Sequence, residues 1–187
     1  LKNQNVPDDY IYRVDAIYDR YCGHLGCTRS HMKALEIAKK NNWNNVLILE
    51  DDAKFNMNTE KINENFNIFF NNFNNWNILM LHDCHSILEK THINNFKKVN
   101  CSTMAISYII KDTYIDTLLK NFKEGEYHLQ KELEVFKKNN KNKKLIHTGN
   151  ALDQYWRELQ KKDLWYTYIP NIIISANYWS SINKSFE

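Results

Sequence analysis

The feature that most constrains the fold is the apolar run Val46–Leu49, which ends directly in Glu50, Asp51 and Asp52. A short, unbroken and partly β-branched run is typical of a strand buried on both faces of an α/β sheet. Ligands of such sheets usually collect at the carboxyl ends of the strands, where these acids stand. Side chains alternate along an extended segment, so we expect Glu50 and Asp52 to point together and Asp51 to point away.

Two carboxylates that face one place suit Mg²⁺ or Mn²⁺, which bind carboxylates together with substrate phosphates and waters. A solvated acidic turn explains the same residues, because acids are ordinary at the ends of strands. The triplet alone leaves these two interpretations balanced.

The composition indicates one globular domain over residues 1–187, because a chain of this size that is 43% hydrophobic can bury a substantial core. Its 25 basic residues are mixed with 22 acidic ones, which gives little support to a nucleic-acid partner. No segment approaches the ~20 apolar residues that a membrane span needs. The cytoplasm and the lumen of the secretory pathway both fit this composition. Abundant asparagine, with many lysines and isoleucines, indicates an AT-rich coding genome, such as a viral one.

The cysteines are too few for a disulfide scaffold in a chain of this length, so free thiols are expected. One short segment nevertheless combines four ligand types that zinc prefers. It lacks a second ligand pair at the usual distance, which disfavours a structural zinc site. The four residues of this segment are Cys22, His24, Cys27 and His31.

The hydrophobic pattern predicts an alternation of strands and helices, which favours a mostly parallel sheet flanked by helices. Residues 123–147 are charge-rich and predict a helix followed by an exposed loop; a solvated surface explains them better than an attraction for an anionic partner. The expected strands are 10–14, 46–49, 76–81, 104–110 and 164–168, the last at a sheet edge. The expected helices are one that follows a glycine turn at 23–27 with Thr28 or Ser30 as its cap, then 59–73, 112–122 and 151–160.

Four stretches carry a resemblance to a known family. They are Val14-Asp15-Ala16, the Gly-x-x-Gly-Cys-x-x-Ser-His element at 23–31, Leu47–Asp52, and Ala151-Leu152-Asp153 followed by Tyr168-Ile169-Pro170 and Ser180-Ser181-Ile182. Their order resembles glycosyltransferase family 25, the lipopolysaccharide-biosynthesis and procollagen-galactosyltransferase group. The resemblance covers the chain from about Val14 onward and implies a GT-A-like nucleotide-sugar transferase fold. The family's first strand, with its Ile-Asn-Leu and Arg-rich element, has no counterpart before Tyr10, so either this strand lies outside the sequence or the protein has lost it.

The resemblance also implies roles for the acids. Asp52 is the expected metal ligand, Glu50 faces the same cation or the ribose of a UDP-sugar, and Asp51 orients a neighbouring backbone group or lysine. The cation, Mn²⁺ or Mg²⁺, would neutralise charge on the departing UDP. Asp153 is the expected general base for the acceptor hydroxyl. Without the resemblance, Asp153 is better explained as an acid at a helix N-terminus.

Further contacts to the donor are expected near the start of the first helix. Arg29 and Ser30 suit an anion, because helix N-termini present free N–H groups. His31 can donate to a phosphate or sugar, and a packed histidine is an equally good explanation. Trp156 and Trp179 suit stacking on a sugar or uracil, although core positions are the commoner role of such residues.

The function expected is therefore a metal-dependent glycosyltransferase that moves a hexose from a UDP-sugar to a hydroxyl group of a glycan or protein. The alternative is a degenerate, inactive transferase domain that binds a glycan or a protein. A metal-dependent phosphoesterase is a third hypothesis, for which Asp83 and His85 are the obvious additional ligands.

Overall fold

The computed structural model describes residues 1, 4–140 and 143–176, so Trp179 and the 180–182 stretch lie outside the described residues. Short 3₁₀ turns occur at Asp8–Tyr10 and Asp112–Tyr114. The helices are α1 (Gly23–Lys40), α2 (Thr59–Asn72), α3 (Ile115–Asn139), α4 (Leu152–Tyr155) and α5 (Arg157–Lys162). The strands are β1 (Asn45–Leu49), β2 (Ala53–Phe55), β3 (Ile78–Met80), β4 (Cys84–Lys90), β5 (Phe96–Thr103), β6 (Ser107–Lys111), β7 (Trp165–Tyr168) and β8 (Ile173–Ser175).

The main sheet of the described chain has the strand order β1-β6-β3-β7-β5-β4, and β2 pairs with β8 in a separate two-stranded sheet. Within the described part of the chain, β3 and β7 are the only strands that pair in parallel, and the other pairs are antiparallel. The prediction of a mostly parallel sheet is therefore wrong. Its cause is the antiparallel β4–β5 hairpin, which the hydrophobic pattern did not reveal, and the position of β6 between β1 and β3, antiparallel to both.

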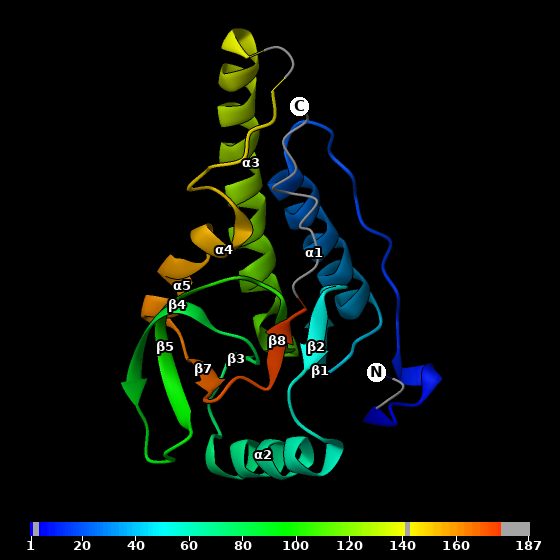
Figure 1. Cartoon of the computed structure of the whole chain (residues 1–187), viewed down its shortest axis with the longest axis vertical. Coiled ribbons are helices and arrows are strands. Elements are labelled where there is room, and N and C mark those ends of the chain that lie inside the picture. The colour runs from blue at the N-terminus through cyan, green and yellow to red at the C-terminus, as the bar shows by residue number, and fades with distance from the viewer. Residues whose placement is uncertain (2–3, 141–142, 177–187) are drawn as a thin grey trace.

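The structure is a three-layered α/β arrangement, with helices on both faces of the sheet (Figure 1). Side chains alternate across β3, so Ile78 and Met80 pack toward α1, α3 and Trp156, whereas Leu79 and Leu81 pack toward α2 and β8. Asn58 caps α2 by accepting from the Lys61 amide at 3.0 Å. The helix expected at 59–73 is thereby confirmed.

Several sequence expectations need correction. Strand β1 lies at the edge of the sheet and is half-buried along most of its length, rather than covered on both faces. Strand β7 was expected at an edge but lies between β3 and β5. Residues 11–22 form no strand, and helix α1 already begins at Gly23, without a side-chain cap from Thr28 or Ser30. The helix expected at 112–122 and the helix expected in the charge-rich region form one helix, α3, which ends at Asn139 and is followed by a loop, as predicted.

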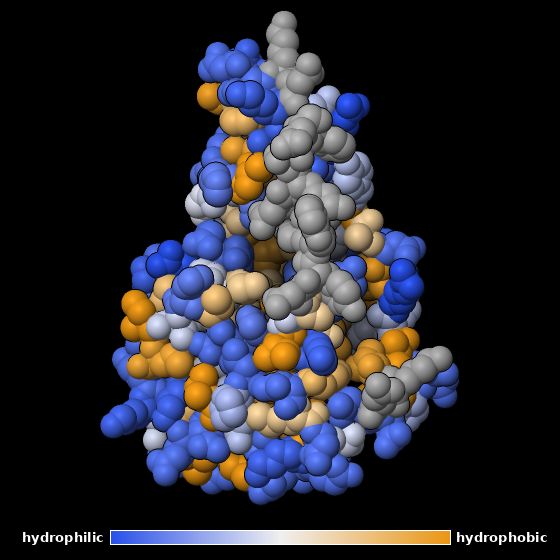
Figure 2. Space-filling model, viewed as in Figure 1, coloured by the Kyte–Doolittle hydropathy of each residue, from blue (hydrophilic) through white to orange (hydrophobic). Residues whose placement is uncertain are grey.

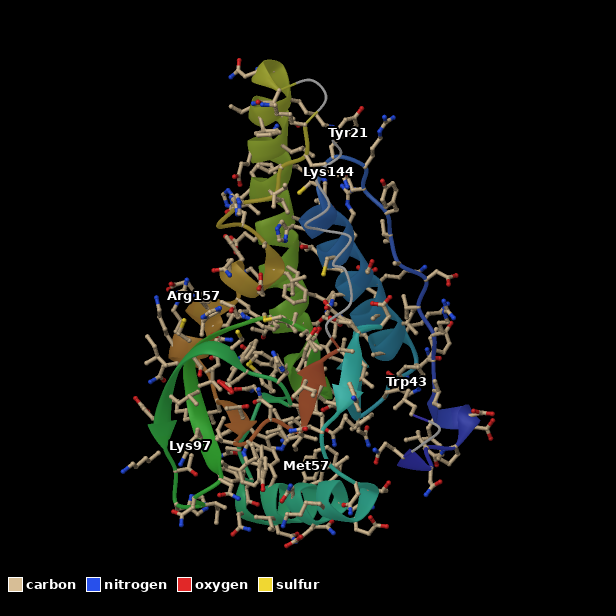
Figure 3. All side chains as sticks on the ribbon, in the orientation of Figure 1. Tyr21, Trp43, Met57, Lys97, Lys144 and Arg157 are labelled. Atoms are coloured by element: carbon tan, nitrogen blue, oxygen red, sulfur yellow. The ribbon has the colours of Figure 1, made fainter. Side chains whose placement is uncertain are left out.

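The segment before α1 runs alongside that helix and is fixed to it (Figure 1). The Ile17 amide donates to Ser30 Oγ at 2.8 Å, and the ring of Tyr12 meets that of Trp43 edge-on at 5.8 Å, at the position labelled in Figure 3. A Cβ atom on Gly26 would lie only 2.3 Å from the Ile17 carbonyl oxygen. Gly26 therefore permits the close approach that holds the segment against α1.

No helix in the described ranges has the length and apolar character that crossing a membrane requires.

Candidate active site

The three acids form a turn between β1 and β2. The Glu50 amide donates to the Ile106 carbonyl at 2.9 Å, and the Ala53 amide donates back to the Glu50 carbonyl at 3.2 Å. This is the hydrogen bond of a β-turn, so the extended geometry expected for the triplet is wrong. The electrostatic influence of both Glu50 and Asp52 nevertheless reaches the Cys27 thiol, whereas Asp51 is exposed.

Glu50 is held by a buried histidine. His31 Nε2 lies 3.0 Å from Glu50 Oε1, and His31 Nδ1 lies 3.0 Å from the Tyr108 hydroxyl. Tyr108 is fully buried and His31 is nearly so. Burial by itself raises the pKa of Glu50, but the hydrogen bond and charge of His31, with a hydrogen bond from Cys27, bring this pKa below its ordinary value. The carboxylate of Glu50 is therefore kept ionised.

Cys27 completes the surroundings of Glu50. Its thiol donates to Glu50 Oε1 at 3.5 Å. The pKa of this thiol is well above its ordinary value, mainly because the thiol is buried and secondly because of the negative charge of Glu50. In the described ranges, Cys27, His31 and Glu50 are the one group whose candidate metal-binding atoms gather, all within 4.8 Å of one another. The sequence segment considered for zinc does not converge, because Cys22 packs with Leu25 and Leu129 while His24 bonds to the Ile146 carbonyl at 2.8 Å.

Asp52 has one satisfied and one unsatisfied carboxylate oxygen. Oδ2 accepts a hydrogen bond from the Ser175 hydroxyl at 2.8 Å, and the Asp52 carbonyl accepts from the Ala176 amide at 2.8 Å. Oδ1 is buried and has no hydrogen-bond partner among the described residues. A buried carboxylate oxygen in this state is costly unless a proton donor or a cation meets it. The hard oxygen donors Asp52 and Glu50 thus fit the divalent cation that the sequence predicts.

Asp153 lies in the short helix α4 and faces the connection between β5 and β6. Its Oδ2 accepts a hydrogen bond from the Met104 amide at 3.0 Å. Met104 has a φ of 69°, a left-handed backbone conformation that residues other than glycine and asparagine rarely adopt. Asp153 also contributes to the high pKa of the Cys27 thiol, so it lies on the same side of the molecule as Glu50 and Asp52.

The other expected donor contacts are engaged within the protein. Arg29 Nε donates to Glu126 at 2.6 Å, and its guanidinium lies 3.9 Å from Asp19. Ser30 Oγ accepts from Ile17 and donates to the Gly26 carbonyl at 2.8 Å. Both stay predictions as anion contacts.

Trp156 is a core residue, fully buried, with its indole N–H donating to the Ser102 carbonyl at 3.0 Å. Asp83 and His85, the extra ligands of the phosphoesterase hypothesis, do not join the group formed by Cys27, His31 and Glu50. The sequence did not single out Tyr108, Ser175 or Met104. Tyr108 carries a usable signal, because a tyrosine within a buried apolar strand needs a hydrogen-bond partner.

A comparison with models of protein families shows to which family this chain belongs. A model of glycosyltransferase family 25, described as LPS biosynthesis protein, matches residues 22–130. The chain belongs to glycosyltransferase family 25. A comparison with curated proteins gave no match.

Membership of family 25 marks the chain as a glycosyltransferase, and it implies a sugar donor and an acceptor. The matched range includes the glycine-rich start of α1, the acidic turn and Tyr108. It ends within α3, so Asp153 and Ser175 lie beyond it. The role of Asp153 therefore stays a prediction from the sequence resemblance.

Proposed function

We propose that this chain is a metal-dependent glycosyltransferase that moves a hexose from a UDP-sugar to a hydroxyl group of a glycan or protein acceptor. The observation that carries the proposal is the oxygen Asp52 Oδ1, which is buried without a hydrogen-bond partner among the described residues, on the turn that also carries Glu50. A buried carboxylate oxygen of this kind is stabilised when a cation or a proton donor meets it.

Asp52 and Glu50 would hold Mn²⁺ or Mg²⁺ at this turn. When bound, the cation neutralises the charge that develops on the diphosphate leaving group. Ser175 and His31 each fix one oxygen of these carboxylates, which leaves Asp52 Oδ1 and the second oxygen of Glu50 as the ligand atoms. Asp51, which is exposed, would orient a neighbouring backbone group or lysine.

Asp153 would act as the general base. The Met104 amide holds Oδ2, so Oδ1 accepts the proton from the acceptor hydroxyl as the oxygen attacks the anomeric carbon. The bond between the anomeric carbon and the diphosphate oxygen breaks in the same step, and UDP departs with that electron pair. The strained backbone of Met104 supports this role, because strain persists where it holds a group in place.

Arg29, Ser30 and His31 would lie near the donor phosphates at the start of α1. His31 uses one ring nitrogen for Glu50 and the other for Tyr108. A contact from His31 to a phosphate therefore requires it to exchange one of these partners on donor binding.

One observation favours the alternative of an inactive binding module. Residues 11–22 form no strand, and within the described chain β1 has a partner on one side only. The edge of the sheet nearest the acidic turn is thus incomplete relative to the fold expected for the family.

The two functions are separated by assaying the full chain with UDP-hexoses and Mn²⁺ for UDP release and glycosyl transfer. The Asp153→Asn variant keeps an acceptor for the Met104 amide but loses the base. We expect its turnover to fall by about 10²- to 10⁴-fold with donor binding retained. Asp116→Asn, an exposed change on α3, is the control. Full activity of Asp153→Asn would refute the base, and an inactive wild-type chain that binds no donor would refute the transferase.

A further inference from the structure

A pocket of about 620 Å³ lies beside the proposed base. Its wall is formed by His24 at the start of α1, Glu132 on α3, the connection at 146–151, and Asp153 with Gln154 on α4. Figure 2 shows the molecule hollowed on the face where α1 and α4 approach each other in Figure 1. The volume lies within the range of sites that hold small molecules.

The acidic residues in the pocket lining are not balanced by basic ones. Glu132 and Asp153 are two carboxylates in its lining, and no lysine or arginine is among the lining residues of the described chain. An anionic ligand would meet these carboxylates without a compensating cation, which is unfavourable. The pocket is therefore unsuited to the diphosphate of a donor and suited to an uncharged, hydroxyl-rich ligand.

Glu132 also shapes the pocket wall. Its Oε2 accepts hydrogen bonds from the Thr148 hydroxyl at 2.6 Å and from the Asn150 side-chain amide at 2.9 Å. These bonds tie the connection before α4 to α3. Beside them, the ring nitrogens of His147 have no hydrogen-bond partner among the described residues, so His147 is free to bind a ligand hydroxyl.

We propose that this pocket is the acceptor subsite, that it takes an uncharged sugar ring, and that Glu132 excludes acidic sugars from it. The inference rests on the proposed function, because Asp153 can deprotonate only a hydroxyl bound in its reach. Nucleophile and base then meet in one pocket, while the charged donor binds at the acidic turn.

The test compares two probes that differ only at C6, methyl β-D-glucoside and methyl β-D-glucuronide, by NMR titration of the full chain. We expect the glucoside to shift resonances of residues 146–154 and the glucuronide to bind about tenfold more weakly. Glu132→Gln keeps an oxygen that accepts from Thr148 and Asn150 but removes the charge. This variant should bring the two probes to within about threefold of each other. Glu134→Gln, an exposed change two residues later, is the control and should retain the discrimination.

Equal binding of the two probes by the wild-type chain would overturn the inference, as would shifts that map away from this pocket or no binding of the glucoside at all. Donor binding is measured separately with a UDP-hexose and Mn²⁺. A chain that binds the glucoside here but no UDP-hexose would retain a sugar-binding pocket while the transferase proposal fails. A chain that binds UDP-hexose but no glucoside would keep the proposed donor site while the inference of an acceptor subsite fails.

Discussion

The Ser175 hydroxyl donates a hydrogen bond to Asp52 Oδ2 at 2.8 Å, although 123 positions separate the two residues. Ser175 also pairs with Ala53, the residue after Asp52, at the end of the β2–β8 sheet. The orientation of Asp52 therefore depends on the chain returning at β8 to close over the acidic turn.

Ser175→Ala should weaken this closure. We expect a loss of about 1–2 kcal/mol in the free energy of unfolding, because the hydrogen bond is to a charged group but is only partly buried. Urea denaturation measures the loss. Ser86→Ala on β4 is a suitable control, since that hydroxyl has no hydrogen-bond partner among the described residues. Equal stability of the two variants would show that Ser175 does not hold Asp52.

Tyr108→Phe should destabilise the site from within the core. It removes the hydroxyl that meets His31 Nδ1 and leaves this nitrogen buried without a partner, at a cost of about 1–3 kcal/mol. The unfolding free energy reports this cost, and NMR of the His31 ring reports any change of tautomer. Tyr12→Phe, an exposed change, should alter neither. An unchanged His31 ring in Tyr108→Phe would contradict the hydrogen-bonded chain from Tyr108 to Glu50.

In Gly26→Ala, two effects act in opposite directions. Alanine favours a helix over glycine by about 1 kcal/mol, but here the added Cβ would lie 2.3 Å from the Ile17 carbonyl oxygen. Because this neighbour is backbone, we expect the clash to prevail, with a lower melting temperature and faster proteolysis of the segment before α1. Gly149→Ala meets nothing within 4 Å and should be tolerated. A Gly26→Ala variant more stable than the wild type would show that the segment does not pack as described.

Stability should fall at alkaline pH. Burial raises the pKa values of Tyr108 and Tyr114 above their ordinary value near 10, and the hydrogen bond to Asp163 raises that of Tyr114 further. Their contribution to stability is thus fully present below about pH 10, the pKa of the unfolded phenol, and is lost as pH rises above it. Urea denaturation from pH 8 to pH 11 measures this loss. Tyr114→Phe should reduce the slope, whereas exposed Tyr18→Phe should not.

Some elements could be predicted because their signals are local. The spacing of Ile62, Phe66 and Phe69 marks α2, and Asn58 marks its start. The acidic triplet could be located in the same way, since an apolar run followed by acids needs no knowledge of the rest of the chain. Its turn geometry could not, because the hydrogen bond from Glu50 to Ile106 depends on β6 pairing beside β1.

The missed elements and partners are those set by distant parts of the chain. Strand β5 carries Lys97 and Lys98 between buried Phe96 and Val99, a pattern too short and too charged to identify a strand in the middle of a sheet. Tyr108 reaches His31 across 77 positions only through the register of β6. The family resemblance supplied Asp153, and its hydrogen bond from Met104 became apparent only with the fold.

Calorimetry of UDP-hexose binding, with and without Mn²⁺, tests the central claim most directly when the wild-type chain is compared with Asp52→Asn. This variant keeps an oxygen for the Ser175 hydroxyl and removes the charge that the cation requires. We predict that the wild-type chain binds the donor only with Mn²⁺ and that Asp52→Asn binds it at least about tenfold more weakly, a difference of about 1.4 kcal/mol. Donor binding that is independent of Mn²⁺, or equal in the two proteins, would contradict a metal-dependent site at the acidic turn.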